Sequence, residues 1–133
     1  MDKILIVDDE ESIIESISMV LGDEKYEIDS SLNGMSAIEK VKSAEYDLII
    51  LDITMPGTDS LALLKSIFTH RPEQKIMIFS MCSAGIYAKN YLHLGVKAFV
   101  NKEAEPMEVR KVIEAVVNNR RYAGPSEDRK SVV

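Results

Sequence analysis

The feature that most constrains this chain is the stretch 48–57, where four apolar residues run into Asp52 and a Met-Pro-Gly turn follows at 55–57. An apolar run this short, β-branched at two positions and stopped by Pro-Gly, is typical of a strand buried in a parallel sheet rather than of a helix. Open α/β sheets bind their ligands just beyond the carboxyl ends of such strands. Asp52 is therefore expected to lie in a functional crevice.

Strand-like and helix-like segments alternate five times along the chain. Apolar runs predict strands at residues 4–7, 26–30, 48–51, 75–80 and 97–101. Apolar residues recur at helical spacing after each run, with Gly22 as a stop, Asn33 as a candidate N-cap and Pro106 at the start of the last helix. Five βα units in series predict an α/β fold with a doubly wound parallel sheet and right-handed crossovers.

The third helix is expected to begin at Asp59 or Ser60, either of which can cap it, and to end before Pro72. The residues expected on its apolar face are Leu61, Leu64, Ile67 and Phe68.

Composition narrows the class of protein. The 133 residues suit one domain, and the single cysteine, Cys82, excludes an intramolecular disulfide and favours a reducing compartment. The start of the chain lacks a secretory signal, and no apolar stretch is long enough to span a bilayer, so we expect a cytoplasmic protein with no membrane contact. A net charge of -6 argues against direct binding of nucleic acid and suits Mg²⁺ or a basic partner.

Polar residues stand at the ends of four predicted strands. Asp8 and Asp9 follow the first strand, Asp52 the third, Ser80 closes the fourth, and Lys102 follows the fifth. Because the carboxyl ends of parallel strands share one edge of a sheet, these side chains are expected to face one crevice.

Three aspartates in one crevice repel one another, and a hard divalent cation removes that conflict. Mg²⁺ prefers oxygen ligands and needs only one or two carboxylates besides water. We expect Asp9 and Asp52 to bind Mg²⁺ directly, together with the Thr54 carbonyl and a water held by Asp8.

The predicted crevice has no histidine base and no cysteine nucleophile, but it combines a carboxylate, a metal, an ammonium and a hydroxyl. These are the parts needed for phosphoryl transfer to a carboxylate. Asp52 would attack the phosphoryl group, Lys102 and Mg²⁺ would neutralise its charge, and the Ser80 hydroxyl would donate to a phosphoryl oxygen.

From Lys3 to about Asn119, the chain resembles the receiver domain of two-component response regulators. The resemblance rests on four motifs in order, each at a strand end: Val7-Asp8-Asp9-Glu10, Asp52-x-x-Met55-Pro56-Gly57, Ser80, and Phe99-Val100-Asn101-Lys102. It implies a (βα)5 flavodoxin-like fold with strand order 2-1-3-4-5. It also implies that Asp52 accepts a phosphoryl group from a sensor histidine kinase, and that Asp8 and Asp9 help to hold Mg²⁺.

The resemblance further implies a switch. Ser80 would move toward the phosphoryl group, Phe99 would turn inward behind it, and the face formed by the fourth helix, the fifth strand and the fifth helix would change its partners, with a homodimer as one possibility. No chemistry is expected beyond the domain's own phosphorylation and autodephosphorylation.

Two further segments, 102–106 and 119–122, are similar to receivers of the NarL/LuxR class, which usually carry a C-terminal helix-turn-helix domain. No such domain is present in this chain, so DNA would be bound only through a domain outside it. We expect a receiver domain at 1–119 and a linker or tail at 120–133.

Three alternatives remain. Asp8 and Asp9 could simply cap the first helix. The chain could be a Mg²⁺-dependent phosphatase working through an aspartyl phosphate, although such enzymes typically place an acid-base aspartate where Thr54 stands. It could also be a pseudo-receiver that only binds a partner.

Two departures from the receiver pattern concern residues beside the site. Glu103 follows Lys102 where most receivers have a proline, and Met81 is large where a small residue is common. Met81 is expected to narrow access for phosphodonors or to slow hydrolysis.

Overall fold

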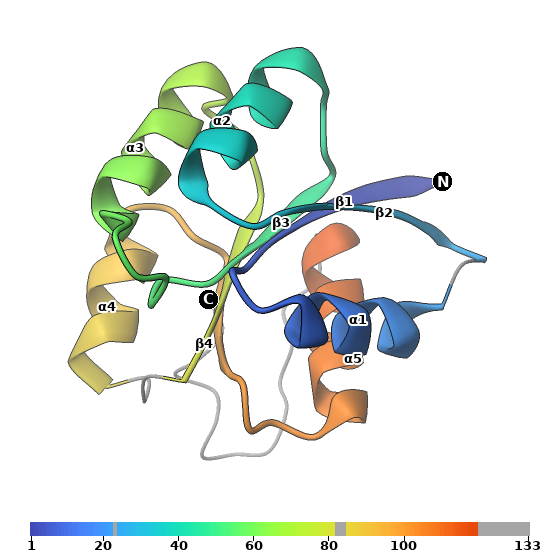
Figure 1. The fold of residues 1–133 in the computed structure, drawn as a ribbon. Coiled ribbons are helices and arrows are strands. Elements are labelled where there is room, and N and C mark those ends of the chain that lie inside the picture. The colour runs from blue at the N-terminus through green and yellow to red at the C-terminus, as the bar shows by residue number, and fades with distance from the viewer. Residues whose placement is uncertain (23, 82–84, 120–133) are drawn as a thin grey trace.

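The computed structural model describes residues 1–22, 24–81 and 85–119. Strands and helices alternate from the first residues to the last helix (Figure 1). The strands are β1 (Asp2–Val7), β2 (Tyr26–Ser31), β3 (Leu48–Leu51), β4 (Ile76–Ser80) and β5 (Ala98–Asn101). The helices are α1 (Glu11–Leu21), α2 (Gly34–Ser43), α3 (Ser60–His70), α4 (Gly85–His93) and α5 (Pro106–Val117).

The five strands form one parallel sheet in the order β2-β1-β3-β4-β5, as predicted. In register, Val7 lies beside Leu51 in β3, and Ser80 lies beside Asn101 in β5. The carboxyl ends of β1, β3, β4 and β5 therefore meet at one edge. Because β2 pairs only with β1, its more polar sequence stands at an edge of the sheet.

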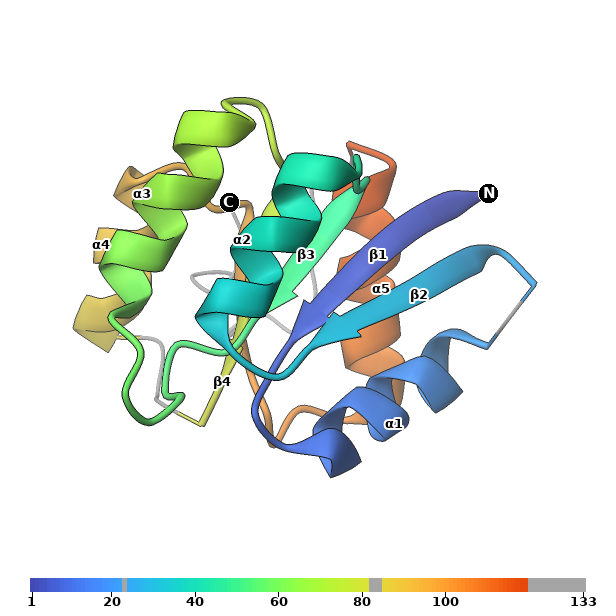
Figure 2. The same cartoon turned by 45° about the horizontal axis from the view of Figure 1, so that its top comes forward.

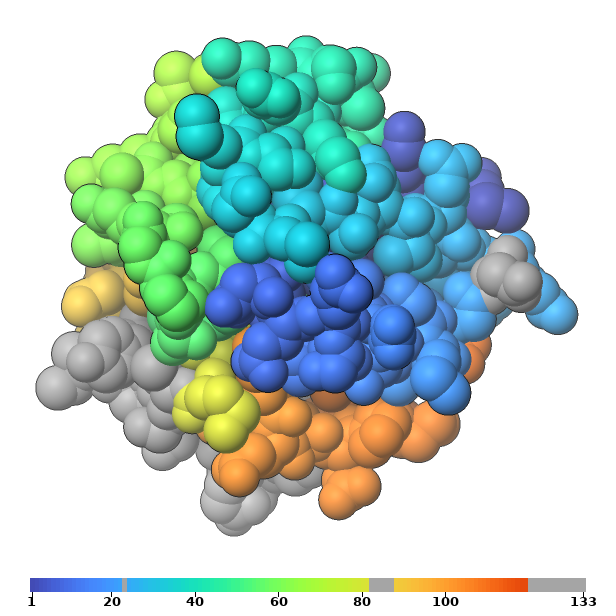
Figure 3. All heavy atoms as spheres, viewed as in Figure 1, coloured from blue at the N-terminus to red at the C-terminus, as the bar shows by residue number. Residues whose placement is uncertain are grey.

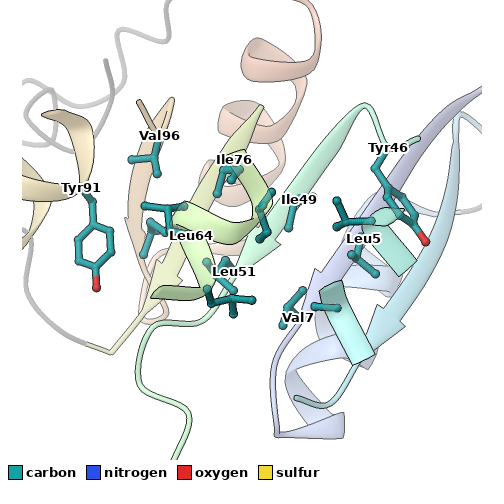
Figure 4. Close-up of a cluster of buried hydrophobic side chains, with 14 of the residues drawn as sticks. Leu5, Val7, Tyr46, Ile49, Leu51, Leu64, Ile76, Tyr91 and Val96 are labelled. Carbon is teal, nitrogen blue, oxygen red and sulfur yellow. The ribbon is translucent and has the colours of Figure 1, made fainter. Parts of the chain in front are cut away.

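Helices cover both faces of the sheet (Figures 1 and 2). The side chains of each strand alternate between the two layers. Leu5, Val7 and Ile49 pack in one core with α2, α3 and α4, part of which Figure 4 shows. Ile4 and Ile6 face the other way, into a second core with α1 and α5. This double burial explains the uninterrupted apolar strands.

Local signals set the helix ends where the sequence predicts them. The Asn33 side chain accepts a hydrogen bond from Ser36 N at 2.8 Å, and Asp59 accepts one from Ala62 N at 3.1 Å. Gly22 ends α1 with φ 69°, a conformation that favours glycine, and Pro106 is the first residue of α5.

The predicted inner face of α3 is wrong at one position. Leu61 is 44% exposed, whereas Leu63 is buried and joins Leu64 and Ile67 in the core. Because Asp59 caps the helix, position 61 falls in its first turn, outside the stripe that packs on the sheet. The predicted tail at 120–133 lies outside the described residues.

Candidate functional site

The site is assembled by the backbone at the carboxyl edge of the sheet. The amide of Asp8 donates to Ser31 O at 3.0 Å, and the amide of Asp52 donates to Val7 O at 3.0 Å. The amide of Lys102 donates to Ser80 O at 2.9 Å. Figure 3 shows the segments that follow β1 (blue), β3 (green), β4 (yellow) and β5 (orange) meeting on one face. These backbone hydrogen bonds thus set the positions of Asp8, Asp52 and Lys102 along the edge of the sheet.

The Lys102 ammonium lies between two carboxylates from different strands. Its Nζ is 2.8 Å from Asp8 Oδ2 and 3.4 Å from Asp52 Oδ2. The three side chains are only 2–3% exposed. Residues distant in the sequence therefore form one buried charged group, as the motif positions predict.

Burial and neighbouring charges shift the pKa values of Asp8 and Lys102. Burial, with the nearby Asp52 carboxylate, raises the pKa of Asp8 despite opposing hydrogen bonds from Lys102 and from the amide of Glu10. Burial alone would lower the pKa of Lys102, but Asp8 and Asp52 outweigh it and raise that pKa. The lysine is thus held in its charged form beside two acids.

Asp52 is held by the turn that follows its strand. Its Oδ1 accepts hydrogen bonds from Thr54 N at 2.9 Å and from Thr54 Oγ1 at 2.7 Å. The side chain of Asp52 therefore has one oxygen engaged by Thr54 and the other facing Lys102.

The acidic run after β1 offers oxygens for a divalent cation. Carboxylate oxygens of Asp8, Asp9 and Glu10 lie within 4.8 Å of one another, with Asp8 buried and the other two exposed. Asp52 adds a fourth carboxylate, and among the described residues Lys102 is the cation that pairs with members of this set. An excess of negative charge on hard oxygen donors fits Mg²⁺.

Glu10 has no assigned role in the sequence-based prediction, although its Oε1 lies 3.9 Å from Lys102 Nζ. The Asp-Asp-Glu run was the signal that could have identified it. The capping interpretation of Asp8 and Asp9 is disfavoured, because α1 begins after Glu10 without a side-chain cap and Asp8 is turned toward Lys102.

Ser80 and Phe99 are both buried, 0% and 1% exposed, in neighbouring strands. The Phe99 ring lies inside the α4 side of the sheet, with its centroid 6.2 Å from that of Tyr91. Met81, directly after Ser80, is 58% exposed at the rim of the site. After Lys102, the amide of Glu103 donates to Asn101 Oδ1 at 2.7 Å, so an asparagine side chain closes the turn.

The chain is similar to a known protein family and to several known proteins. The model of the response regulator receiver domain family matches residues 4–114. The chemotaxis protein CheY of Treponema pallidum is 32% identical over 119 residues, which cover 87% of this chain and 81% of that protein. Seven further curated relatives have names describing transcriptional or other regulatory proteins, and the chain spans 33–58% of their lengths.

Solved structures agree with the fold. The response regulator TrrA of Thermotoga maritima, crystallised in complex with Mg²⁺-BeF, has a TM-score of 0.77 and 34% identity, covering 87% of this chain and 99% of TrrA. A LuxR-family response regulator from Aurantimonas has a TM-score of 0.84 at 22% identity, covering 96% of this chain and 94% of its own, which shows a shared fold. None of the helices in the described part of the chain is long and apolar enough to cross a membrane.

Proposed function

The chain belongs to the response regulator receiver family, and from this premise we propose that Asp52 accepts a phosphoryl group from a sensor histidine kinase. The observation that carries the proposal is the buried Lys102 ammonium, shared between Asp8 and Asp52. A fixed cation beside a buried carboxylate is what phosphoryl transfer to that carboxylate requires, because negative charge gathers on the transferred oxygens.

The residues of the site have separate tasks in this proposal. Asp52 supplies the attacking oxygen, and Lys102 neutralises the phosphoryl group with a charge that needs no rearrangement. Asp8, Asp9, Asp52 and the Thr54 carbonyl would hold Mg²⁺, with Glu10 close enough to contribute. Bound Mg²⁺ would supply a second positive charge on the phosphoryl oxygens.

The output proposed for the phosphorylated state is a change of the face formed by α4, β5 and α5. Ser80 would donate a hydrogen bond to the phosphoryl group, and the Phe99 ring behind it would change its packing. Both side chains are buried, so a movement of either one would change the contacts of β5. The names of two relatives, both transcriptional regulatory proteins, support a role in the control of transcription. We propose that this control acts through a DNA-binding domain outside this chain and that activation favours a homodimer. We propose that the protein works in the cytoplasm.

Intact-mass analysis after incubation with Mg²⁺ and a small acyl-phosphate donor tests the proposal. We expect one phosphoryl adduct on the wild-type protein, none on Asp52→Ala, and none when Mg²⁺ is chelated. Asp2→Ala is the matched control, because it removes an aspartate from the opposite end of β1. An adduct that persists in Asp52→Ala would refute the assignment, as would a folded wild-type protein that takes up no phosphoryl group.

The alternative of a phosphatase acting on an external substrate makes a different prediction. Turnover would release phosphate from many donor molecules per protein, whereas a receiver stops at one adduct and releases phosphate only at the rate at which that adduct decays. Thr54, whose N–H and O–H both bind Asp52, occupies the position where such a phosphatase would carry its acid-base aspartate.

A further inference from the structure

The turn that carries Lys102 is held by the residue before it, Asn101. The amide of Lys102 donates to the carbonyl of Ser80 in β4 at 2.9 Å. The next two amides both donate to Asn101: that of Glu103 to the side-chain Oδ1 at 2.7 Å, and that of Ala104 to the backbone carbonyl at 3.0 Å. Asn101 therefore closes the turn twice, once with its backbone and once with its side chain.

The backbone is thus held on both sides of Lys102. The peptide unit before it is bonded to Ser80 O, and the unit after it contains the amide that donates to Asn101 Oδ1. Because peptide units are planar, these two units together set the direction in which the lysine side chain leaves the backbone. That side chain is only 3% exposed, and its Nζ lies 2.8 Å from Asp8 Oδ2 and 3.4 Å from Asp52 Oδ2.

The residue types on either side of Lys102 suit this arrangement. Asparagine is favoured at the first position of a tight turn, because its side chain accepts a hydrogen bond from the backbone two residues later. Glu103 stands where most receivers have a proline, and a proline has no N–H to donate to Asn101. The amide side chain is also neutral, so it holds the turn without adding a carboxylate to a site that already has an excess of them.

We propose that Asn101 is a positioning residue for phosphoryl transfer. Its side-chain oxygen holds the peptide unit between Lys102 and Glu103, and so keeps the Lys102 ammonium between the carboxylates of Asp8 and Asp52. The effect on phosphorylation rests on the proposed function. The effect on the ammonium does not depend on that function, so the two are tested separately.

Loss of this hydrogen bond should affect phosphorylation more than folding. The bond between Glu103 N and Asn101 Oδ1 is exposed, so water can replace the lost acceptor and little stability is lost. The ammonium of Lys102, in contrast, stands at the end of a flexible four-carbon stem. When it is displaced from Asp52, it no longer meets the charge that gathers on the transferred oxygens, and a small displacement of this kind changes a rate strongly.

The test uses two variants of Asn101 and one control. Asn101→Leu keeps the size and branching of the side chain but has no acceptor. Asn101→Ser keeps a neutral oxygen that can accept in the same kind of turn. Asn33→Ala is the matched control, because the Oδ1 of Asn33 also accepts one hydrogen bond from the backbone, from Ser36 N at 2.8 Å at the start of α2.

The first measurement is the rate of adduct formation with Mg²⁺ and a small acyl-phosphate donor, followed by intact mass. We expect Asn101→Leu to form the adduct about tenfold more slowly than the wild-type protein. Asn101→Ser should come within about threefold of the wild-type rate, and Asn33→Ala should equal it. The Mg²⁺ affinity of Asn101→Leu, measured by thermal unfolding at a series of Mg²⁺ concentrations, should stay within about twofold of wild type, because the predicted ligands lie on other segments.

NMR of the lysine ammonium gives a readout that a merely structural role would not change. With ¹⁵N-labelled lysine, the Nζ protons of Lys102 should exchange slowly with water in the wild-type protein, because the side chain is buried and paired. Loss of the signal in Lys102→Met identifies it. Exchange should be about tenfold faster in Asn101→Leu and close to the wild-type rate in Asn101→Ser and Asn33→Ala. Equal exchange in Asn101→Leu and wild type would overturn the inference even if the rates of phosphorylation differed.

The outcomes separate the two proposals. If the wild-type protein forms no adduct at Asp52, the proposed function fails, and the ammonium exchange alone decides whether Asn101 holds Lys102. If the adduct forms and Asn101→Leu forms it at the wild-type rate, only the inference about Asn101 fails. Should Asn101→Leu fail to fold, Asn101→Ala takes its place, because it removes the same acceptor and introduces no larger side chain.

Discussion

Within residues 1–22, 24–81 and 85–119, a lysine side chain forms ion pairs with aspartate at two centres. The Lys102 centre (Lys102, Asp8 and Asp52) lies at the carboxyl ends of the strands and is 2–3% exposed. The Lys40 centre (Lys40, Asp29 and Tyr46) connects edge strand β2 to α2 and to the loop before β3, and its lysine and aspartate side chains are 36–37% exposed. The more deeply buried centre is also the one with more negative charge than positive.

In the Lys40 centre, the carboxylate of Asp29 accepts hydrogen bonds from three donors. Asp29 accepts from Tyr46 Oη at 2.6 Å, from Lys40 Nζ at 3.0 Å and from the amide of Ser30 at 2.8 Å. Lys40 also donates to the carbonyl of Ser30. Although burial opposes it, the hydrogen bonds from Tyr46 and Lys40 hold the pKa of Asp29 below its usual value.

The pKa of Asp8 is raised whereas that of Asp29 is lowered, and the two directions reflect the different charge balance of the two centres. Two buried carboxylates share a single ammonium at the Lys102 centre, which leaves negative charge for a ligand of opposite sign. The Lys40 centre is electrically balanced and stabilises the fold.

Lys102→Met should have the largest effect on both function and stability. Removal of the ammonium leaves Asp8 and Asp52 buried without a counter-charge, which lowers the free energy of unfolding by about 3 kcal/mol. Phosphorylation by a small donor should slow by about 100-fold or more. Urea unfolding measures the change in stability, and the rate of adduct formation measures the change in phosphorylation. A change of less than about 0.5 kcal/mol in the free energy of unfolding would contradict the contrast between the two centres.

Asp29→Asn should lower the free energy of unfolding by about 2 kcal/mol at pH 7, after allowance for its partial exposure, and leave phosphorylation unchanged. Because the folded-state pKa of Asp29 is lowered, its stabilising effect is present above the unfolded pKa of about 4 and is lost as the pH falls through the folded value. Urea unfolding at a series of pH values should therefore show a constant gap to wild type near neutrality and a shrinking gap below about pH 4. A gap that widened on acidification would contradict this account.

Mg²⁺ should stabilise the wild-type protein by about 1.4 kcal/mol at ten times its dissociation constant. Mg²⁺ should stabilise Asp29→Asn by the same amount, because the Lys40 centre lies outside the acidic site. It should stabilise Asp9→Asn by less. Thermal unfolding with and without Mg²⁺ measures it. Equal stabilisation by Mg²⁺ in Asp9→Asn and in wild type would remove Asp9 from the predicted ligands.

Tyr46→Phe should have the smallest effect, about 1 kcal/mol, from loss of the hydroxyl bond to Asp29. Burial and that bond raise the pKa of Tyr46, so its contribution is full below the unfolded pKa of about 10 and is lost as the pH rises through the folded value. Unfolding measured between neutral and alkaline pH should show the gap to wild type closing above about pH 10.

Sequence patterns predicted the fold and the convergence of the strand ends because those signals are local. The apolar run before Asp52, the cap at Asn33 and the proline that opens α5 each depend on a few neighbouring residues. The side-chain pairing of Lys102 with Asp8 rather than Asp9 depends on which residue after β1 turns inward, and a pair of adjacent aspartates gives no signal for that.

The Lys40 centre was not predicted at all. Asp29, Lys40 and Tyr46 belong to three different elements or connections, and each alone is an ordinary polar residue. The hydrogen bond from the Thr54 hydroxyl to Asp52 was not predicted for a different reason. The sequence shows which residue follows Asp52 by two positions, but the rotamer that brings its oxygen to Oδ1 is visible only in three dimensions.

Lys102 directly follows the last strand, so its place in the site depends on the docking of that strand. β5 is an edge strand that pairs only with β4, and the hydrogen bond that the amide of Lys102 donates to Ser80 O forms only once β5 has docked. A domain with this strand undocked would keep Asp8 and Asp52 but lack the ammonium that faces both of them. The charge balance of the site is therefore complete only after the last strand has joined the sheet.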